Sequence, residues 1–339
     1  MNRLTRLFAG MSVAFFIMSN VDAAEKVTVD SFVRAETDSI LASYVEQGGF
    51  GKFSHQRKPV SVDDQKVIRM NRDTLYSVGV FDLTEPVTLV KPDSKGRYQS
   101  MMVLSQDHYV AMIDYGSGEH TLTRDQVGTR YACVIFRTFA DANDPSDIKK
   151  ANALQDMISA HQRHVGAFEK PDWDAMSLKQ VREAINVLAG TRSDTKGMFG
   201  TKEQIDPISH LLGTAYGWGG LPEEAAIYKN VVPEKNDGTT PYSVTVKDVP
   251  VDGFWSVTVY GKDGFMVKNA RNAYSYNNVT ADKNPDGSIT INFGGGRTSV
   301  NNLPITPGWN YIVRMYQPRK EVIDGTWQFP EPRLAKGKH

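Results

Sequence analysis

Cysteine is nearly absent from this sequence, and neither sign of charge is in excess. The chain has one cysteine, Cys133, in 339 residues, and its 39 Lys and Arg balance its 39 Asp and Glu. A single cysteine forms no internal disulfide, so the fold must be stabilised by packing. A balanced charge provides no electrostatic attraction for nucleic acid or an anionic membrane, and neither is predicted as a partner.

Familiar catalytic and metal-binding motifs are missing as well. The sequence contains no His-Glu-x-x-His pattern and no Gly-x-Ser-x-Gly elbow, which removes common signatures of zinc proteases and serine hydrolases. Cys133 lies in the apolar, strand-like run 131–136, where a cysteine behaves as a small hydrophobe rather than a nucleophile. No cofactor is predicted.

A long apolar run occurs only at the start of the chain. Arg3 and Arg6 precede the apolar stretch 7–18, and small residues follow at Val21 and Ala23. This order is typical of an export signal that is cleaved after Ala23, and the run is too short for a spanning helix. An uncleaved interfacial anchor is the alternative. We therefore expect residues 1–23 to be a signal peptide and the mature protein to be periplasmic or secreted, without a membrane span.

Residues 24–143 are predicted to form an N-terminal β domain preceded by one helix. Apolar residues recur at helical spacing within 30–48, after which short strand-like runs alternate with turn residues. The expected strands are 74–81, 87–90, 98–104, 108–113 and 131–138. Short strands at regular spacing favour a β-sandwich or jelly roll.

A helical region is predicted for residues 144–230, and a second β domain for residues 231–339. Asp144 and Pro145 begin a helix whose apolar spacing continues to His161, and further helices are expected at 181–188, 205–216 and 222–228. Strands are expected at 243–246, 254–260, 288–293 and 311–316. The predicted fold class is mainly β with a helical insert: two sandwich or jelly-roll domains bracketing a helical region.

The densest polar cluster, Asn71, Arg72, Asp73 and Tyr76, stands at the entry to a predicted strand. An arginine beside a tyrosine hydroxyl at the mouth of a sandwich can bind a carboxylate or a sugar. The alternative is a turn before the strand with an ordinary ion pair. Both interpretations remain open.

Catalytic candidates are fewer. Asp107 and His108, with Tyr76, are the residues most suited to acid–base chemistry, because histidine titrates near neutral pH. A hydrogen-bonded structural histidine is the alternative. His161 and His164 share a face of the predicted helix, but too few further ligands accompany them, and no metal site is predicted.

Aromatic residues crowd the second β domain. Rings such as Trp255, edged by Asn269, Asn302 and Arg314, would suit a sugar or a small organic acid, although core packing is the simpler role for most rings. If Arg72, Arg314 and Tyr76 share one concave pocket, a ligand site is supported.

Two sets of motifs resemble known domains. The N-terminal segments resemble the domain of unknown function 1254; they are Met70-Asn-Arg-Asp-Thr-Leu-Tyr76, Asp82-Leu83, Arg137-Thr138 and Asp144-Pro145. The C-terminal segments resemble its usual companion, the domain of unknown function 1214; they are Gly220-Leu-Pro222, Gly253–Tyr260, Asn269, Asp286–Ile291, Asn302-Leu-Pro304 and Arg314–Pro318. The resemblance implies a multi-domain, often exported protein with β-sandwich or jelly-roll parts, and no established activity.

The function expected from these observations is binding of a small polar ligand, a sugar or a carboxylate, in a cleft near the β domains. The alternative is a metal-independent enzyme of the hydrolase or lyase type that acts on a carbohydrate or a small carboxylate. The sequence leaves open whether the protein is an enzyme, and it does not indicate an oligomeric state.

Overall fold

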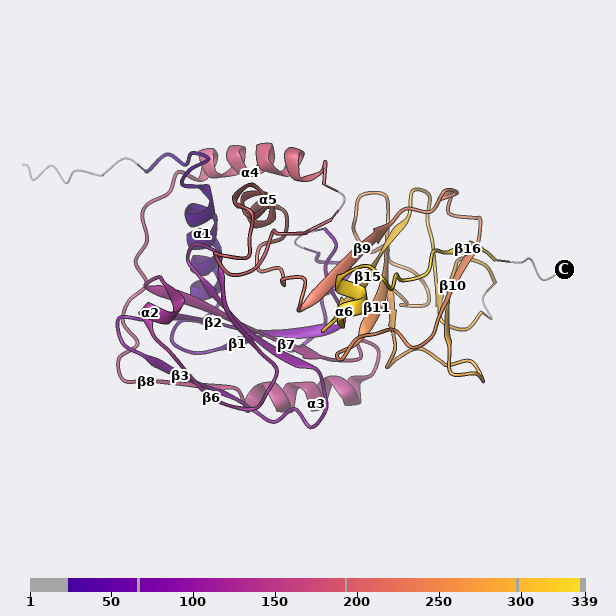
Figure 1. Ribbon diagram of the computed structural model, residues 1–339, viewed down its shortest axis with the longest axis horizontal. Coiled ribbons are helices and arrows are strands. Elements are labelled where there is room, and N and C mark those ends of the chain that lie inside the picture. The colour runs from indigo at the N-terminus through magenta and orange to yellow at the C-terminus, as the bar shows by residue number, and fades with distance from the viewer. Residues whose placement is uncertain (1–23, 66–67, 193, 297–298, 336–339) are drawn as a thin grey trace, which may run out of the picture.

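The computed structural model of the protein describes residues 24–65, 68–192, 194–296 and 299–335. The predicted signal peptide, residues 1–23, lies outside the described residues. Within them the fold is mainly β, with 16 strands in four sheets and six helices. Figure 1 shows two halves side by side: an N-terminal half with both sheets and helices, and a C-terminal half built mostly of strands.

The N-terminal half contains a five-stranded and a three-stranded sheet. The strands of the larger sheet, in spatial order, are β1 (Ser54–His55), β2 (Thr74–Asp82), β7 (Tyr131–Phe139), β4 (Gln99–Ser105) and β5 (Val110–Asp114). The smaller sheet is β6 (Gly118–Leu122), β3 (Val87–Lys91) and β8 (Ser159–Gln162). Phe81, Leu89 and Val134 share one core cluster between the two sheets, so this half is a β-sandwich.

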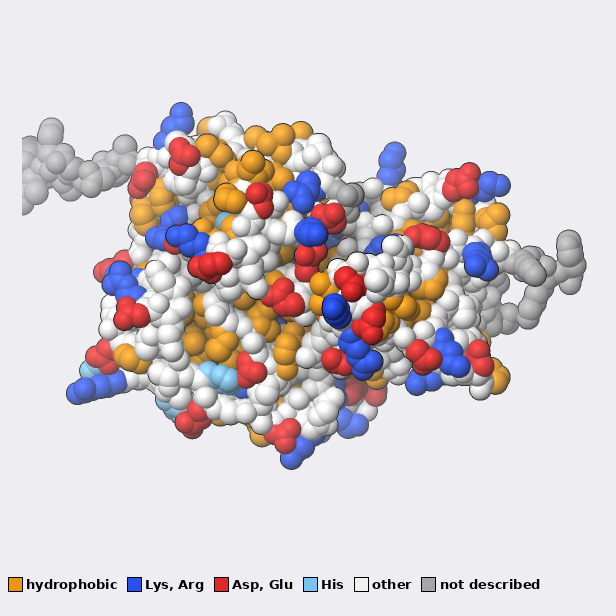
Figure 2. Space-filling view, in the orientation of Figure 1, with side chains coloured by type: hydrophobic (Ala, Val, Ile, Leu, Met, Phe, Trp, Pro, Cys, Tyr) orange, Lys and Arg blue, Asp and Glu red, His pale blue; other side chains and the backbone are white. Residues whose placement is uncertain are grey.

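Helices cover the other face of the five-stranded sheet. Leu41 of α1 (Phe32–Glu46) packs in the cluster that includes Val78 and Val80 of β2, and α4 (Ala175–Ala189) and α5 (Pro207–Gly217) pack against α1. Because β2, β4 and β7 are buried on both faces, they read as nearly continuous apolar runs. Apolar side chains also remain exposed over α4 and α5, among them Met176, Val187, Leu188 and Ile208 (Figure 2).

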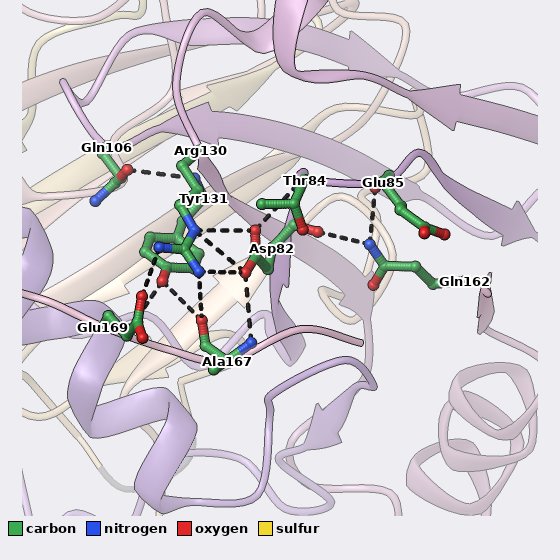
Figure 3. A network of polar contacts seen from close by, with 9 residues as sticks. All are labelled: Asp82, Thr84, Glu85, Gln106, Arg130, Tyr131, Gln162, Ala167 and Glu169. Atoms are coloured by element: carbon green, nitrogen blue, oxygen red, sulfur yellow. Dashed lines mark hydrogen bonds and ion pairs between the residues drawn. The ribbon is translucent and has the colours of Figure 1, made fainter. Parts of the chain in front are cut away.

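A network of charged groups fixes the segment that connects β8 to α4 (Figure 3). Arg130 donates to both carboxylate oxygens of Asp82 and to Glu169, and the hydroxyl of Tyr131 donates to the carbonyl of Ala167. Gly166 has φ +75°, and a Cβ there would lie 2.5 Å from Oδ2 of Asp82. The segment is therefore held closely against the end of β2.

The C-terminal half is a sandwich of two four-stranded sheets. One sheet is β14 (Asn302–Leu303), β13 (Ile289–Phe293), β10 (Tyr242–Val246) and β16 (Arg333–Leu334). The other is β12 (Ser275–Asn277), β11 (Trp255–Tyr260), β15 (Asn310–Tyr316) and β9 (Ala226–Val231). Val257, Val313 and Ile291 lie in the core between them.

The opposite face of β11 and β15 meets the N-terminal half. Strand alternation turns Tyr260, Arg314 and Tyr316 to this face, and all three are buried. The ring of Tyr316 stacks on Phe254, with centroids 4.3 Å apart, and lies 5.5 Å from the ring of Tyr98 in the N-terminal half. The junction of the two halves therefore combines aromatic packing with buried polar groups.

One expected helix is wrong, and another begins as predicted but ends earlier than expected. The helix α3 (Pro145–Asp156) is capped by Asp144 and ends before His161. Two further helices, α2 (Arg124–Val127) and α6 (Lys320–Ile323), are single turns. His161 instead lies in β8, opposite Thr88 of β3, because the backbone of this segment pairs with β3. The segment expected as a helix at 222–228 enters β9, which pairs with β15 over six residues.

The other main expectations are confirmed. The helices expected at 30–48, 181–188 and 205–216 correspond to α1, α4 and α5, and the expected strands of both halves are present within a few residues of their predicted bounds. The mainly β, multi-domain fold class is also confirmed. No helix in the described parts of the chain has both the length and the apolar character required to cross a bilayer.

Candidate functional site

The predicted polar cluster lies at the junction, immediately before β2. Asn71 forms an Asx turn, since its Oδ1 accepts from the backbone N–H of Asp73 at 2.7 Å. Its Nδ2 donates to the hydroxyl of Tyr316 on β15, also at 2.7 Å. One amide side chain thus shapes the approach to β2 and connects the two halves.

Arg72 is buried at the same junction. Its guanidinium donates to the carbonyl of Val60 and lies 5.3 Å from the ring centroid of Tyr274 in the C-terminal half. Burial lowers the pKa of Arg72, whereas Tyr274 and Asp73 raise it, and the net shift is downward. Because an arginine titrates far above neutral pH, Arg72 stays charged.

Asp73 is 3% exposed, and its two carboxylate oxygens have different surroundings. Oδ1 accepts from the hydroxyl of Ser275 at 3.0 Å and from Nδ2 of Asn277 at 3.5 Å. Oδ2 is buried and has no hydrogen-bond partner among the residues that the structure describes. A buried carboxylate oxygen without a donor is costly, so this oxygen can accept a hydrogen bond from a bound molecule.

A small cleft opens beside Asp73, between the two halves. Arg72 and Asp141 line it from the N-terminal half, and the C-terminal half contributes a wall of amides and hydroxyls. That wall consists of Asn272, Tyr274, Ser275, Asn277 and Thr280. The lining is rich in hydrogen-bonding groups of both kinds, which suits a polar, hydroxylated ligand.

Arg314 does not line the cleft but stabilises the segment that carries Asp73. Its guanidinium donates to Oγ1 of Thr258 at 3.0 Å, to the hydroxyl of Tyr260 at 2.7 Å and to the carbonyl of Arg69 at 2.8 Å. Burial opposes its charge, but Tyr260 and other neighbours, Asp73 among them, outweigh burial and raise the pKa of Arg314. Arg314 therefore holds the 69–73 segment in place.

Tyr76 belongs to a different part of the junction. It lies in β2, partly exposed, with the guanidinium of Arg137 on β7 at 5.5 Å from its ring centroid. Arg72, Arg314 and Tyr76 thus lie at one junction without lining one pocket, since only Arg72 of the three lines the cleft.

Three other predicted ligand residues lie within the C-terminal half. Trp255 is 4% exposed and packs on Phe329, with ring centroids 5.5 Å apart, in the core of the sandwich. Asn269 closes a turn by donating to the carbonyl of Ala273 at 3.0 Å. Asn302 donates to the carbonyl of Gly296 at 3.3 Å. The structure gives each of them a local structural role.

The predicted catalytic pair is divided between surface and interior. Asp107 is half exposed and accepts from Arg34. His108 is buried: its Nδ1 donates to Oγ1 of Thr214 at 2.9 Å, and its Nε2 accepts from the backbone N–H of Gly219 at 2.8 Å. Burial and the neighbouring His210 lower the pKa of His108 to about 3, so the ring is neutral at physiological pH.

Metal ligands do not gather in the described part of the chain. Across these residues no group of three or more His, Cys, Asp or Glu side chains is placed to hold a metal ion. Cys133 is buried in β7, and burial raises the pKa of its thiol, which keeps it protonated. Neither feature supplies a cofactor site.

Sequence reasoning did not single out Arg137 as a site residue. Arg137 is the one charged side chain in the nine-residue buried strand Tyr131–Phe139, and that isolation is the signal that could have identified it. The residues around it come from distant segments, including Tyr98 and Tyr228, and their convergence cannot be read from the sequence.

Comparisons with known proteins support the expected pair of domains and give no activity. Residues 50–122 match the family described as a protein of unknown function, DUF1254, and residues 227–320 match the protein of unknown function DUF1214. The predicted resemblance is therefore confirmed for both segments in the expected order. No functionally curated protein matches the chain.

Two solved structures share the fold. The crystal structure of the VPA0106 protein from Vibrio parahaemolyticus is 20% identical, with a TM-score of 0.65, and covers 91% of this chain and 98% of its own. An uncharacterised protein from Burkholderia cenocepacia is 14% identical, with a TM-score of 0.52, and covers 91% of this chain and 88% of its own. At these identities the likeness extends to the fold alone.

Proposed function

We propose that this protein is an exported binding protein that takes a small neutral sugar or polyol in the cleft beside Asp73. The observation that carries the proposal is Asp73, which lines a cleft formed by both halves and whose Oδ2 atom is buried without a partner among the described residues. A sugar hydroxyl donates a hydrogen bond to such an oxygen and can accept another from the surrounding amides.

The same geometry favours a sugar over a carboxylate as the ligand of this cleft. Asp73 and Asp141 both line it, whereas Arg72 is its lining cation and already donates to Val60. A carboxylate ligand would meet two like charges, and a neutral polyol meets none. Of the two ligand classes expected from the sequence, we therefore propose the sugar.

The test is a thermal-shift and calorimetric screen of the mature chain against neutral monosaccharides, with Asp73→Asn as the key variant. The amide keeps the shape of the carboxylate but places an N–H₂ group near the acceptor position. We expect at least one sugar to stabilise the natural protein and Asp73→Asn to weaken its binding about tenfold or more.

The matched control is Asp93→Asn, which removes an exposed carboxylate that pairs with Lys95 and does not line the cleft. Its sugar affinity should equal that of the natural protein. The proposal fails if no sugar binds, or if Asp73→Asn and Asp93→Asn bind sugar equally well.

A hydrolase remains the second candidate, because two carboxylates, Asp73 and Asp141, line one cleft. Paired carboxylates hydrolyse glycosides when one acts as acid and the other as base or nucleophile. Incubation with aryl glycosides decides between the candidates: release of phenol that is lost in both Asp73→Asn and Asp141→Asn supports the enzyme, and binding without turnover supports the binding protein.

Export is the remaining element of the proposal, and it rests on the sequence of residues 1–23. Intact-mass measurement of the protein from a secreting bacterium should give a chain that begins at Ala24. A chain that retains residues 1–23 in the cytoplasm would contradict the periplasmic or secreted location.

A further inference from the structure

Arg137 is a buried cation that the chain itself only partly satisfies. Its residue is 6% exposed, and one guanidinium nitrogen, NH2, donates to the carbonyl of Gly219. The other, NH1, is buried and has no hydrogen-bond partner among the described residues. A buried guanidinium normally carries a carboxylate partner, because an unpaired internal charge is costly.

After burial, the groups that most affect the pKa of Arg137 are the phenol side chains of tyrosines. Tyr76, Tyr228, Tyr98 and Tyr316 each raise the pKa of Arg137, against the lowering effect of burial. A neutral phenol can donate to an anion but adds no negative charge of its own. The positive charge of Arg137 therefore lacks the compensation that Asp73 gives Arg314.

Two further hydrogen-bond donors lie in the same region. The hydroxyls of Tyr98 and Tyr115 are buried and form no well-aligned hydrogen bond within the described part of the chain, although they interact with each other and Tyr98 interacts with Ser100. The two rings lie 5.9 Å apart. Burial raises the pKa of Tyr115 to about 12, and that of Tyr98 higher still, so both hydroxyls keep their protons. The N–H group of Arg137 is thus available to a ligand that only accepts, and the two hydroxyls, which interact only weakly with each other and with Ser100, can turn to the same ligand.

The surroundings of these donors are largely aromatic. The ring of Tyr98 lies 5.1 Å from the ring of Phe254, which in turn lies 4.9 Å from Phe139. Tyr76, Tyr98 and Tyr228 each retain some exposed surface, and the buried guanidinium of Arg137 lies 5.5 Å from the ring centroid of Tyr76. Such a site would face the charged group of a ligand at its base and the planar or apolar body along its walls.

From these observations we infer that Arg137 anchors a second binding site, separate from the Asp73 cleft, for the carboxylate of a small organic monoanion with an aromatic or apolar body. One uncompensated cation pairs with one negative charge, which favours a monocarboxylate over a phosphate dianion. The hydroxyls of Tyr98 and Tyr115 would donate to the same carboxylate. This inference goes beyond the proposed sugar binding and does not depend on it.

Benzoate is the probe, and benzamide, which has the same shape and no charge, is its matched control. In calorimetric titrations of the mature chain we expect benzoate to bind and benzamide to bind at least about tenfold more weakly. Inorganic phosphate should not compete with benzoate. Equal binding of benzoate and benzamide, displacement of benzoate by phosphate at equal concentration, or no benzoate binding would each overturn the inference.

Variants then locate the site. Arg137→Met should reduce benzoate affinity by about tenfold to a hundredfold, and Tyr98→Phe by about fivefold, since the phenylalanine keeps the ring and removes only the hydroxyl. Asp73→Asn should leave benzoate affinity unchanged, and Arg137→Met should leave sugar affinity unchanged. The two proposals can therefore fail separately. Unchanged benzoate affinity in Tyr98→Phe, or in folded Arg137→Met, would contradict the assignment.

Discussion

Arg314 on β15 and Arg137 on β7 are two arginines of the same junction, one from each half of the molecule. Both are almost fully buried, and Tyr316 contributes to the charge environment of both. Arg314 donates to three separate oxygens, whereas Arg137 donates to the carbonyl of Gly219 and leaves NH1 without a partner among the described residues. The two guanidinium groups are thus similarly buried but differ in how many of their N–H groups form hydrogen bonds.

The difference separates a structural role from a binding role. A fully hydrogen-bonded buried cation fixes its neighbours, and Arg314 fixes the segment that carries Asp73. A buried cation with unused donors stabilises the fold less and retains capacity for a ligand. Residue type and burial alone would give both arginines the same role. The two differ only when the hydrogen-bond acceptors of each guanidinium group are compared.

The largest expected effect separates the two arginines by stability. Arg314→Met would leave the hydroxyl of Tyr260 and the carbonyl of Arg69 without their donor and Asp73 with Arg72 as its remaining nearby cation, so we expect a loss of about 3–5 kcal/mol of unfolding free energy. Arg137→Met should change stability by only about 1 kcal/mol in either direction. Urea unfolding of both variants gives the comparison. Equal losses would show that the two side chains have the same structural role.

A second expected effect is a pH dependence of stability that arises on the Arg137 side of the junction, at His108. The ring of His108 accepts from Gly219, whose carbonyl binds Arg137, and its pKa falls from an ordinary value near 6.5 to about 3 in the fold. Between these values the unfolded chain binds a proton that the folded chain does not. Stability is therefore complete above pH 6.5 and falls on acidification, by up to about 1.4 kcal/mol per pH unit.

The measurement is urea unfolding between pH 4 and 8 for the natural protein and His108→Gln, whose side chain can still accept from Gly219. The variant should show a shallower dependence, by about one proton, because glutamine does not titrate. Acid should also weaken benzoate binding before it affects the bonds of Arg314. Identical pH profiles for the two proteins would mean that His108 is protonated normally in the fold.

The smallest expected effect compares two tyrosine hydroxyls. Tyr260→Phe removes an acceptor of Arg314 and a donor to the carbonyl of Met70, so we expect a loss of about 1 kcal/mol. Tyr98→Phe removes a buried hydroxyl that forms no well-aligned hydrogen bond among the described residues and should be neutral or slightly stabilising. Thermal and urea unfolding measure both. A larger loss in Tyr98→Phe than in Tyr260→Phe would contradict the comparison.

Most strands could be predicted from the sequence because burial of one or both faces of a strand produces a recognisable pattern of apolar residues. In β11 and β15, alternate positions belong to different environments, and β2 and β7 are apolar because both of their faces are covered. The strand β8 has no such pattern, since its four residues are half-buried or exposed and are recruited by pairing with β3. Tertiary contact, rather than local preference, determines its conformation.

The candidate site could be predicted only in part, for a related reason. Asn71, Arg72 and Asp73 are neighbours along the chain, so their cluster was visible before the structure was known. The acceptors of Arg314 and the phenols around Arg137 come from segments up to 245 residues away, and no local pattern encodes such convergence. Trp255 shows the opposite error: an aromatic residue expected at a cleft proved to pack in the core.

The strand β15 has one further consequence for how this chain can vary. Its odd-numbered residues, such as Tyr311 and Val313, fill the core of one sandwich, and its even-numbered residues, such as Arg314, bind the other half of the molecule. A single inserted residue would exchange the two sets, placing a guanidinium among aliphatic side chains and turning apolar groups toward the N-terminal half. The number of residues in β15 is therefore constrained by both of the surfaces that it joins.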